Sequence, residues 1–250
     1  MTWTIPVENI RKSGLWLAAA LVLSGVLRQT GFYNFTARDV EGLNVLIQLV
    51  GDIYAVLLAF TIFVIWGQFT EVENCVMREC NLLADLLRFS KYLNSDTHAE
   101  IRKAMANYTR QVLRSEWPAL GDGRKDRQTD ELFAHFVNSV VQAKLTSEME
   151  QSMYARLVDL VQETSQRRDE RVAKSLTRIP PTISSLVTTI ARVLLLLVFV
   201  YPFHHWLAGA ACFILVAIVL FLANLVMTDT DNPLKGIWNV SPQPFFDLRL

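Results

Sequence analysis

The stretch LNVLIQLVGDIYAVLLAFTIFVIW, residues 43–66, is almost wholly apolar and yet contains Gln48 and Asp52. At about 1.5 Å per residue, a helix of this length reaches about 36 Å, which is enough to cross a lipid bilayer. An ionisable side chain at that depth costs about 2.5–3.5 kcal/mol on insertion scales, so Asp52 needs a partner or an aqueous cavity. The stretch therefore predicts a membrane-spanning helix with one functional polar side.

The apolar residues, which make up 52% of the chain, are concentrated in four such stretches. The other three are residues 13–27, 182–201 and 206–227. Residues 13–27 also resemble a signal peptide, but no small-residue cleavage site follows, which favours a retained helix. Only residues 202–205 separate the last two stretches, so we expect these to form a helical hairpin.

Residues 68–180 form a polar block with apolar residues at helical spacing and with no strand pattern. This pattern predicts a bundle of helices, the first of which continues the helix of residues 43–66 without a break. We expect another of these helices to begin at the cap-like sequence Asn94-Ser95-Asp96-Thr97 and to end near Trp117 and Pro118. Pro242 and Pro244 predict an extended tail after the last span. The sequence therefore predicts an all-α protein of four parts: two membrane helices (1–67), a cytoplasmic helical domain (68–180), a membrane hairpin (181–228) and an extended C-terminal tail (229–250).

The basic residues predict the orientation in the membrane. Of the 24 Lys and Arg residues, 17 lie between residues 68 and 180. Arg11 and Lys12 precede the first span, Lys235 follows the fourth, and the loop of residues 29–42 contains only Arg38. By the positive-inside rule, both termini and the helical block lie in the cytoplasm. We expect a multi-pass protein of a bacterial inner membrane.

Asp52 and Arg192 have two interpretations. Each lies nine residues from the outer end of its span, so both are about 13 Å deep and could form an intramembrane ion pair. Alternatively, Asp52 faces water in a pore formed at a symmetry axis. Gln48, Asp52, Ala55 and Ala59 share one stripe of polar and small residues, which is typical of a channel-lining face. An acidic ring of this kind favours cations.

Two further groups are candidate functional residues. Where the second span leaves the membrane, charged and polar side chains could line the inner vestibule of a pore: Glu71, Glu73, Asn74, Arg78 and Glu79. Such a run could equally be the solvated face of a helix. In the tail, Phe245, Phe246 and Leu248 predict docking into a groove of the same or of a neighbouring subunit.

Other classes of function find little support. The chain has no phosphate-binding glycine loop, dinucleotide-binding motif, zinc-protease motif or nucleophile elbow, so we expect no enzyme. Cys75, Cys80 and Cys212 are not at metal-ligand spacing, and Asp229, Asp231 and Asn232 are typical of a polar turn, so we expect no metal and no cofactor. The formal net charge is zero, which gives no reason to expect nucleic acid as a partner.

From Val50 to Phe246, the chain resembles the bestrophin-like membrane proteins, bacterial relatives of the bestrophin anion channels. The second span carries part of the resemblance, through Tyr54–Phe60 and Trp66. The remaining matches are these: Glu79, Leu82, Leu83, Leu86 and Arg88; Tyr108, Val112 and Glu116-Trp117-Pro118; Arg167, Arg168 and Arg171; Ile179-Pro180-Pro181; and Val240-Ser241-Pro242-Gln243-Pro244-Phe245.

This resemblance implies a homo-oligomer, pentameric in true bestrophins, whose second span lines the pore and whose tail clasps a neighbour. Phe60 and Phe63 are candidates for the apolar neck of such a pore. Asp52 is unexpected in an anion pore, so ion selectivity is not carried over. The predicted function is a homo-oligomeric channel that meets the lipid bilayer and small ions. The alternative is a non-conducting membrane scaffold or signalling protein that acts through its cytoplasmic helices.

Overall fold

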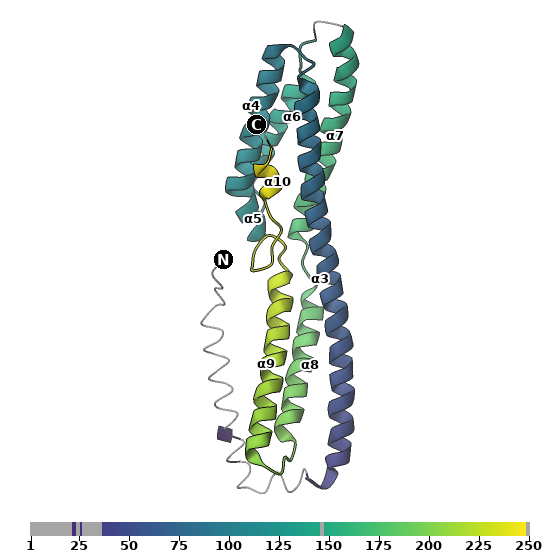
Figure 1. Cartoon of the computed structure of the whole chain (residues 1–250), viewed down its shortest axis with the longest axis vertical. Helices are drawn as coiled ribbons and strands as arrows, with labels where there is room; N and C mark the ends of the chain where they lie inside the picture. Colours follow the sequence, from purple (N-terminus) through teal and green to yellow (C-terminus); the bar gives the residue numbers. More distant parts are fainter. Residues whose placement is uncertain (1–21, 24–25, 27–36, 146–147, 249–250) are drawn as a thin grey trace. The chain divides into compact units, whose positions relative to one another are not determined.

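The computed structural model describes residues 22–23, 26, 37–145 and 148–248, and these contain helices and no strand (Figure 1). The elements are η1 (Ala37–Asp39), α3 (Val40–Ser90), α4 (Ser95–Gln111), η2 (Val112–Glu116), α5 (Trp117–Gly121), α6 (Arg127–Val141), α7 (Glu148–Leu176), α8 (Pro181–Val200), α9 (Trp206–Thr230) and α10 (Gln243–Phe246). The predicted all-α class is confirmed for this part of the chain. The first predicted span, residues 13–27, lies almost entirely outside the described residues.

Three helical segments of the described chain are long and apolar enough to cross a membrane. They lie within Ala37–Ser90, Glu148–Val200 and Trp206–Thr230, and they contain the predicted second, third and fourth spans. The first of these includes α3, which continues for 51 residues, or about 77 Å, as the absence of a break after residue 66 predicted.

The chain divides into two compact units. Unit 1 comprises Met1–Val64, as far as it is described, and Ile179–Thr228; unit 2 comprises Ile65–Arg178 and Asp229–Leu250. In unit 1, the rings of Phe199 and Phe213 pack edge to face with their centroids 5.7 Å apart, which joins α8 to α9. The Thr188 hydroxyl lies 3.1 Å from Asn224 Oδ1 and adds a polar contact between the same two helices.

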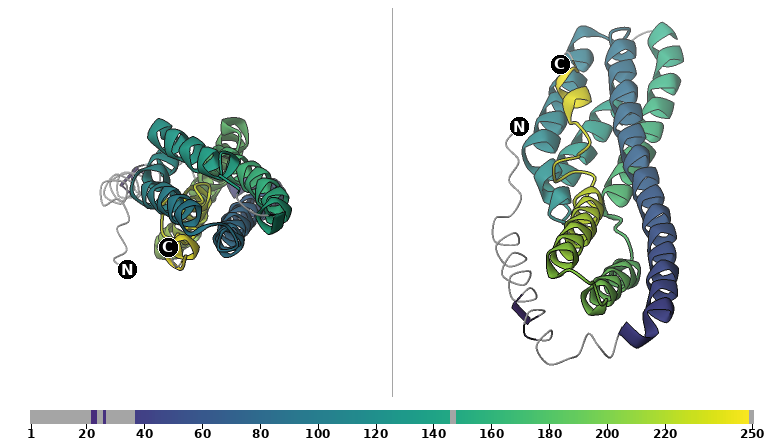
Figure 2. Two further views of the ribbon diagram at one scale, coloured as in Figure 1. Left: turned by 90° about the horizontal axis from the view of Figure 1, so that it is seen from above. Right: turned by 60° about the horizontal axis from the view of Figure 1, so that its bottom comes forward.

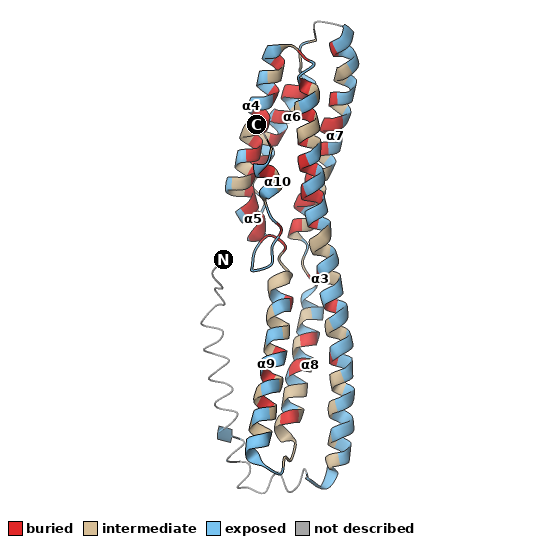
Figure 3. Cartoon of the chain, viewed as in Figure 1, coloured by how far each residue is buried: buried red, intermediate tan, exposed pale blue. Residues whose placement is uncertain are grey.

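Unit 2 has its own hydrophobic core, formed where α4, α6, α7 and the second part of α3 lie side by side (Figure 2). Its fully buried members come from all four helices, and Leu83, Met105, Phe136 and Leu160 are examples. Figure 3 shows these buried positions concentrated along the inner sides of the bundle helices. The apolar stripes predicted from sequence therefore do pack against one another.

Two local predictions about helix ends have different outcomes. Asn94 caps α4, because its side chain accepts a hydrogen bond of 2.9 Å from the Thr97 amide. The helix does not end at Trp117 and Pro118, however. Pro118 lacks an amide hydrogen, and the backbone accommodates it with the wider π-helical turn η2 before continuing as α5.

The prediction of a wholly extended tail is wrong at its end. Residues 243–246 form the single-turn helix α10, for which Pro242 is the N-cap and Pro244 lies in the first turn. Proline is tolerated there because the first amides of a helix have no intrahelical acceptor. This turn allows two successive phenylalanines to point in different directions.

Candidate functional site

The first part of α3 has one side that packs inside unit 1. Tyr54 and Thr61 are 6% and 2% exposed, and Leu57 and Leu58 between them are half-buried. Thr61 donates its hydroxyl hydrogen to the Leu57 carbonyl at 2.7 Å, so its polar atom is satisfied within the helix. This side is therefore occupied by protein, whereas many residues on the remaining sides of the first part of α3 are exposed among the described residues.

The predicted polar stripe lies on the side away from Tyr54. At about 100° per residue, Gln48, Asp52, Ala55 and Ala59 fall between about 100° and 160° from Tyr54 around the helix. All four are exposed, and neither Gln48 nor Asp52 has a hydrogen-bond or ion-pair partner among the described residues. The described part of the subunit therefore provides no partner for the polar side chains of this stripe.

The two phenylalanines proposed for a neck are not equivalent. Both are exposed, at 60% for Phe60 and 75% for Phe63. By the same helical count, Phe63 lies about 20° from Asp52 and continues its stripe, whereas Phe60 lies about 80° from Asp52. Phe60 instead shares a side with the exposed apolar residue Ile53.

The ion pair between Asp52 and Arg192 is not formed within one subunit. Both side chains are exposed, and the ion pairs of the described chain do not include either of them. The equal depths inferred from rise per residue set only the height of the two groups, whereas an ion pair also requires that they face each other. Asp52 is left without a neutralising partner among the residues that the structure describes.

Further along α3, the predicted vestibule residues separate into two groups. Glu71, Asn74 and Arg78 line a cleft of about 430 Å³ that Arg167, Glu170 and Lys174 of α7 complete. Two cations of α7 are already engaged there: Lys174 Nζ lies 2.9 Å from Glu71 Oε2, and Arg167 Nη1 lies 2.9 Å from Glu170 Oε2. Glu73 is exposed and does not line this cleft.

Glu79 does not belong to a solvent-filled vestibule, and this prediction is corrected. Its side chain is fully buried on the inner side of α3, where Oε1 accepts a hydrogen bond of 2.5 Å from the Tyr108 hydroxyl and Oε2 lies 2.6 Å from Arg171 Nε. At this position of α3, the charged side chain therefore points into the core of the bundle and not into water.

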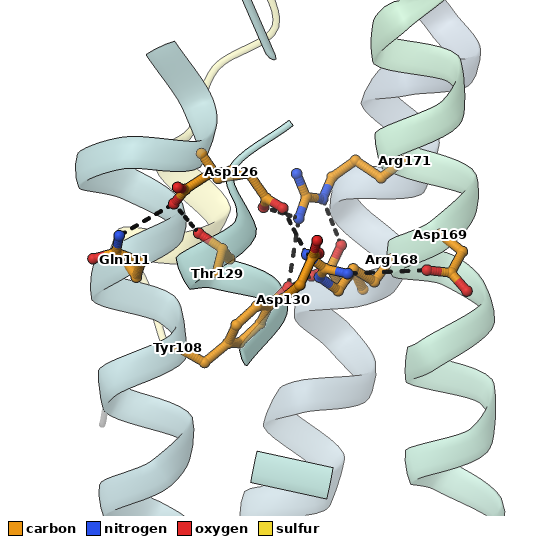
Figure 4. Close-up of polar contacts among 10 residues, drawn as sticks. Tyr108, Gln111, Asp126, Thr129, Asp130, Arg168, Asp169 and Arg171 are labelled. Carbon is orange, nitrogen blue, oxygen red and sulfur yellow. Dashed lines mark hydrogen bonds and ion pairs between the residues drawn. The ribbon is translucent and has the colours of Figure 1, made fainter. Parts of the chain in front are cut away.

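Glu79 is part of a buried polar network that joins four helices (α3, α4, α6 and α7) and η2. Figure 4 labels Tyr108, Asp130, Arg168 and Arg171 of this network. Glu116 lies between two guanidinium groups, with Oε1 2.8 Å from Arg168 Nη2 and Oε2 2.7 Å from Arg171 Nη2. Arg168 also reaches Asp130 Oδ1 on α6 at 2.6 Å. Two buried carboxylates thus compensate two buried guanidiniums, which is the condition under which such charges are tolerated.

The π-helical turn explains why Glu116 can reach this network. With ordinary turns of 3.6 residues, Glu116 would be rotated about 80° away from Tyr108, eight residues earlier. The wider turn keeps both residues on one side, and both are almost fully buried. Glu116, Trp117 and Pro118 therefore act together: the proline forces the turn, and the turn positions the glutamate.

The electrostatics of the network keep the arginines charged. Burial alone would lower the pKa of Arg171, but Glu79 and Glu116 outweigh burial, and the pKa is raised well above its usual value. Burial, together with Glu79, raises the pKa of Tyr108, so that its phenol stays protonated and donates to Glu79. All the acids in this network already accept hydrogen bonds, which is typical of a structural cluster and not of a catalytic one.

The tail docks on the same subunit, but only through some of the predicted residues. Phe245 is 1% exposed, packs edge to face on Trp117 at 6.1 Å between centroids, and lies 5.5 Å from the Arg171 guanidinium carbon. Leu248 packs against the core at its edge. Phe246 is exposed and makes no such contact in this subunit. Sequence reasoning assigned no role to Arg168 or Arg171, although they lie at helical spacing from Leu157, Leu160 and Val161, which are buried on the same helix.

These features agree with a comparison against known families. A model of the Bestrophin-like domain matches residues 15–245, so the chain belongs to the Bestrophin-like family. No curated protein matches. The chain is therefore a membrane protein of this family, in line with its three long apolar helices.

Solved structures show the same fold. A bacterial bestrophin homologue from Klebsiella pneumoniae is similar with a TM-score of 0.67 and 11% identity, over 96% of this chain and 98% of that chain. A single-substitution variant of the Klebsiella homologue has a TM-score of 0.66 and 12% identity, over 92% of this chain and 99% of that one. A structure described as a membrane protein variant reaches 0.67 at 11% identity, over 94% of each chain. At these identities the likeness concerns the fold alone.

Proposed function

We propose that this chain is the subunit of a homo-oligomeric ion channel in which α3 lines the pore. The observation that carries the proposal is the stripe of Gln48, Asp52, Ala55 and Ala59, which is exposed and lies away from the packed side of α3. Turning Asp52 toward lipid would cost about 2.5–3.5 kcal/mol in each subunit. Arranging copies of the chain around water removes this cost, and a ring also shields the water path from lipid. True bestrophins are pentamers, and a pentamer is the expected assembly.

The membrane topology follows from the charge distribution. We propose four spans, with both termini and residues 68–180 on the cytoplasmic side of a bacterial inner membrane, because basic residues gather there. Glu71, Glu73, Asn74 and Arg78 then lie near the inner mouth of the pore. Of these, Glu73 is the best candidate for the vestibule, because the other three line the cleft against α7. Its carboxylate would raise the local concentration of cations.

The first experiment measures assembly and conduction together. The purified protein is sized in detergent and then reconstituted into liposomes for ion-flux measurements. A ring-sized assembly that conducts supports the proposal. A monomer or dimer without flux overturns it and leaves the scaffold function, acting through unit 2.

A second experiment tests which side of α3 meets water. Ala55→Cys and Ile53→Cys are each introduced into a variant that carries Cys212→Ser, since Cys75 and Cys80 are buried. A membrane-impermeant thiol reagent should modify residue 55 and alter flux, and should leave residue 53 unmodified, although both positions are exposed in one subunit. The reverse pattern would place the pore on another side of the helix.

A further inference from the structure

Unit 2 displays a small apolar surface that its own core does not use. It consists of Trp66, Ile237 and Trp238, which are 52%, 43% and 54% exposed, and we call it the tryptophan patch. The two indole rings pack edge to face with their centroids 5.4 Å apart. Trp66 also stacks on Phe69 at 6.1 Å. Two exposed tryptophans in mutual contact expose far more apolar area than an isolated surface residue does.

The backbone of the loop that contains Ile237 and Trp238 is held by hydrogen bonds to Asp229 and by a glycine. The Asp229 carboxylate accepts hydrogen bonds from the backbone amides of Ile237, at 3.0 Å, and Trp238, at 3.3 Å. Gly236 between these partners has φ +117°, and a Cβ at that position would lie 2.6 Å from Asp229 Oδ1. The backbone can therefore wrap round Asp229 only because residue 236 is glycine.

Contacts on both sides of the loop fix it to unit 2. Before the loop, the Asn232 side chain donates to the Gly121 carbonyl at 2.7 Å, and the Lys235 ammonium lies 2.8 Å from Asp122. After it, the Val240 amide donates to the Pro233 carbonyl at 2.7 Å. The exposure of the patch is thus a property of an anchored loop, and the apolar side chains cannot simply fold back into the core.

The position of the patch in the sequence indicates what covers it. Trp66 is the last residue of the apolar stretch 43–66, and Asp229 follows shortly after the apolar residues of α9 end at Met227. Both parts of the patch therefore lie where a span leaves the hydrocarbon region. Tryptophan is enriched at this depth, since its ring is apolar and its N–H can bond to headgroups or water.

We infer that the tryptophan patch is a membrane anchor, through which unit 2 inserts Ile237 and Trp238 into the headgroup region of the adjacent leaflet. The anchor fixes the point at which α3 and α9 leave the membrane. This inference rests on the membrane topology proposed above and is independent of conduction.

Spin labelling tests the environment of the patch directly. Ile237→Cys, in the variant with Cys212→Ser, is labelled with a nitroxide and reconstituted into liposomes of phosphatidylethanolamine and phosphatidylglycerol. Collision with oxygen and with a water-soluble nickel chelate is then measured. A membrane anchor predicts high oxygen and low chelate accessibility. High chelate accessibility would place the patch in water, and low accessibility to both would place it against another subunit; either result overturns the inference. Phe246→Cys, exposed on the tail, is the matched control and should be open to the chelate.

A second experiment uses no spin label and therefore does not depend on how the label affects the loop. Trp238→Phe keeps an aromatic ring against Trp66, and circular dichroism verifies the fold. In liposomes containing lipids brominated close to the headgroup, the quenched share of tryptophan fluorescence should fall relative to the unaltered protein. An unchanged quenched share would contradict the inference. A lipid-exposed label in a protein without ion flux would retain the anchor and reject the channel.

Discussion

Glu116 is the residue on which the buried network of unit 2 depends most. It is the only acid of the described network that contacts both guanidiniums, with one oxygen 2.8 Å from Arg168 and the other 2.7 Å from Arg171. Its neighbour Glu79 contacts only Arg171 and Tyr108. Because these groups are buried, the attraction between their charges is weakly screened. For the same reason, leaving one of the charges uncompensated is costly.

Replacing Glu116 by glutamine should therefore be strongly destabilising. Glu116→Gln keeps the shape but removes the charge, which leaves two buried guanidiniums with too few anions. We expect a loss of about 3–5 kcal/mol in unfolding free energy, the usual result of removing one partner of a buried ion pair. Glu131→Gln is the control, because Glu131 pairs with Arg127 at an exposed site and should cost at most about 1 kcal/mol. Denaturant unfolding of the detergent-solubilised protein measures both; equal losses would show that burial does not matter here.

The adjacent phenylalanines of the tail allow a second residue-level test. Phe245 is buried against Trp117 and Arg171, whereas Phe246 is exposed. Phe245→Ala should cost about 3–5 kcal/mol, and Phe246→Ala should stay within about 0.5 kcal/mol in the single subunit. Thermal unfolding distinguishes them. If Phe246→Ala instead breaks the assembly into single subunits, the exposed ring is a contact between subunits.

At the scale of elements, the motifs that identify the family meet at one place. Glu116-Trp117-Pro118 forms the π-helical turn and its continuation, and the tail motif ends in Phe245, which packs on Trp117. The arginines before the third span belong to α7 and contact Glu116. Segments far apart in the sequence thus contribute to one core.

Gly236, in the loop before α10, allows the conformation of that loop to be tested. Gly236→Ala places a methyl group against the Asp229 carboxylate and forces alanine into a left-handed backbone conformation. We expect a loss of about 1–3 kcal/mol from the backbone conformation alone, and more from the contact. Gly123→Ala is the matched control, because Gly123 also has a positive φ but has open space around it. Equal losses for the two variants, measured by thermal unfolding, would mean that Asp229 does not hold the loop.

Sequence reasoning was most accurate where apolar residues continue at helical spacing, or where a single side chain has a clear local role such as capping a helix. The length of α3 follows from an apolar span that runs without a break into an amphipathic segment. The cap at Asn94 follows from its side chain. Glu79 shows where such reasoning fails, because its burial depends on Tyr108 and Arg171, which are distant in the sequence. The one-turn helix α10 was missed because two prolines are read as excluding a helix, although both are compatible with its first turn.

At the scale of the whole molecule, α3 contributes to two kinds of environment. Its first part carries an exposed polar stripe in unit 1, and its second part supplies Glu79 to the core of unit 2. The sequence could predict the stripe from its spacing. It could not predict that Asp52 and Arg192 remain apart in a single subunit, because depth along a span does not specify the direction that a side chain faces. The described part of one subunit therefore does not identify what satisfies Asp52.

A double-mutant cycle separates the two roles that Asp52 could have in that assembly. If Asp52 faces water in the pore, Asp52→Asn should lower the preference for cations while the oligomer persists, because a ring of negative charges is removed. Arg192→Gln should then add its own effect on stability independently. Ion selectivity in liposomes and oligomer size in detergent are measured for both single variants and for the double variant. If Asp52→Asn dissolves the assembly and Arg192→Gln restores it, the two residues pair across subunits and the carboxylate does not line the pore.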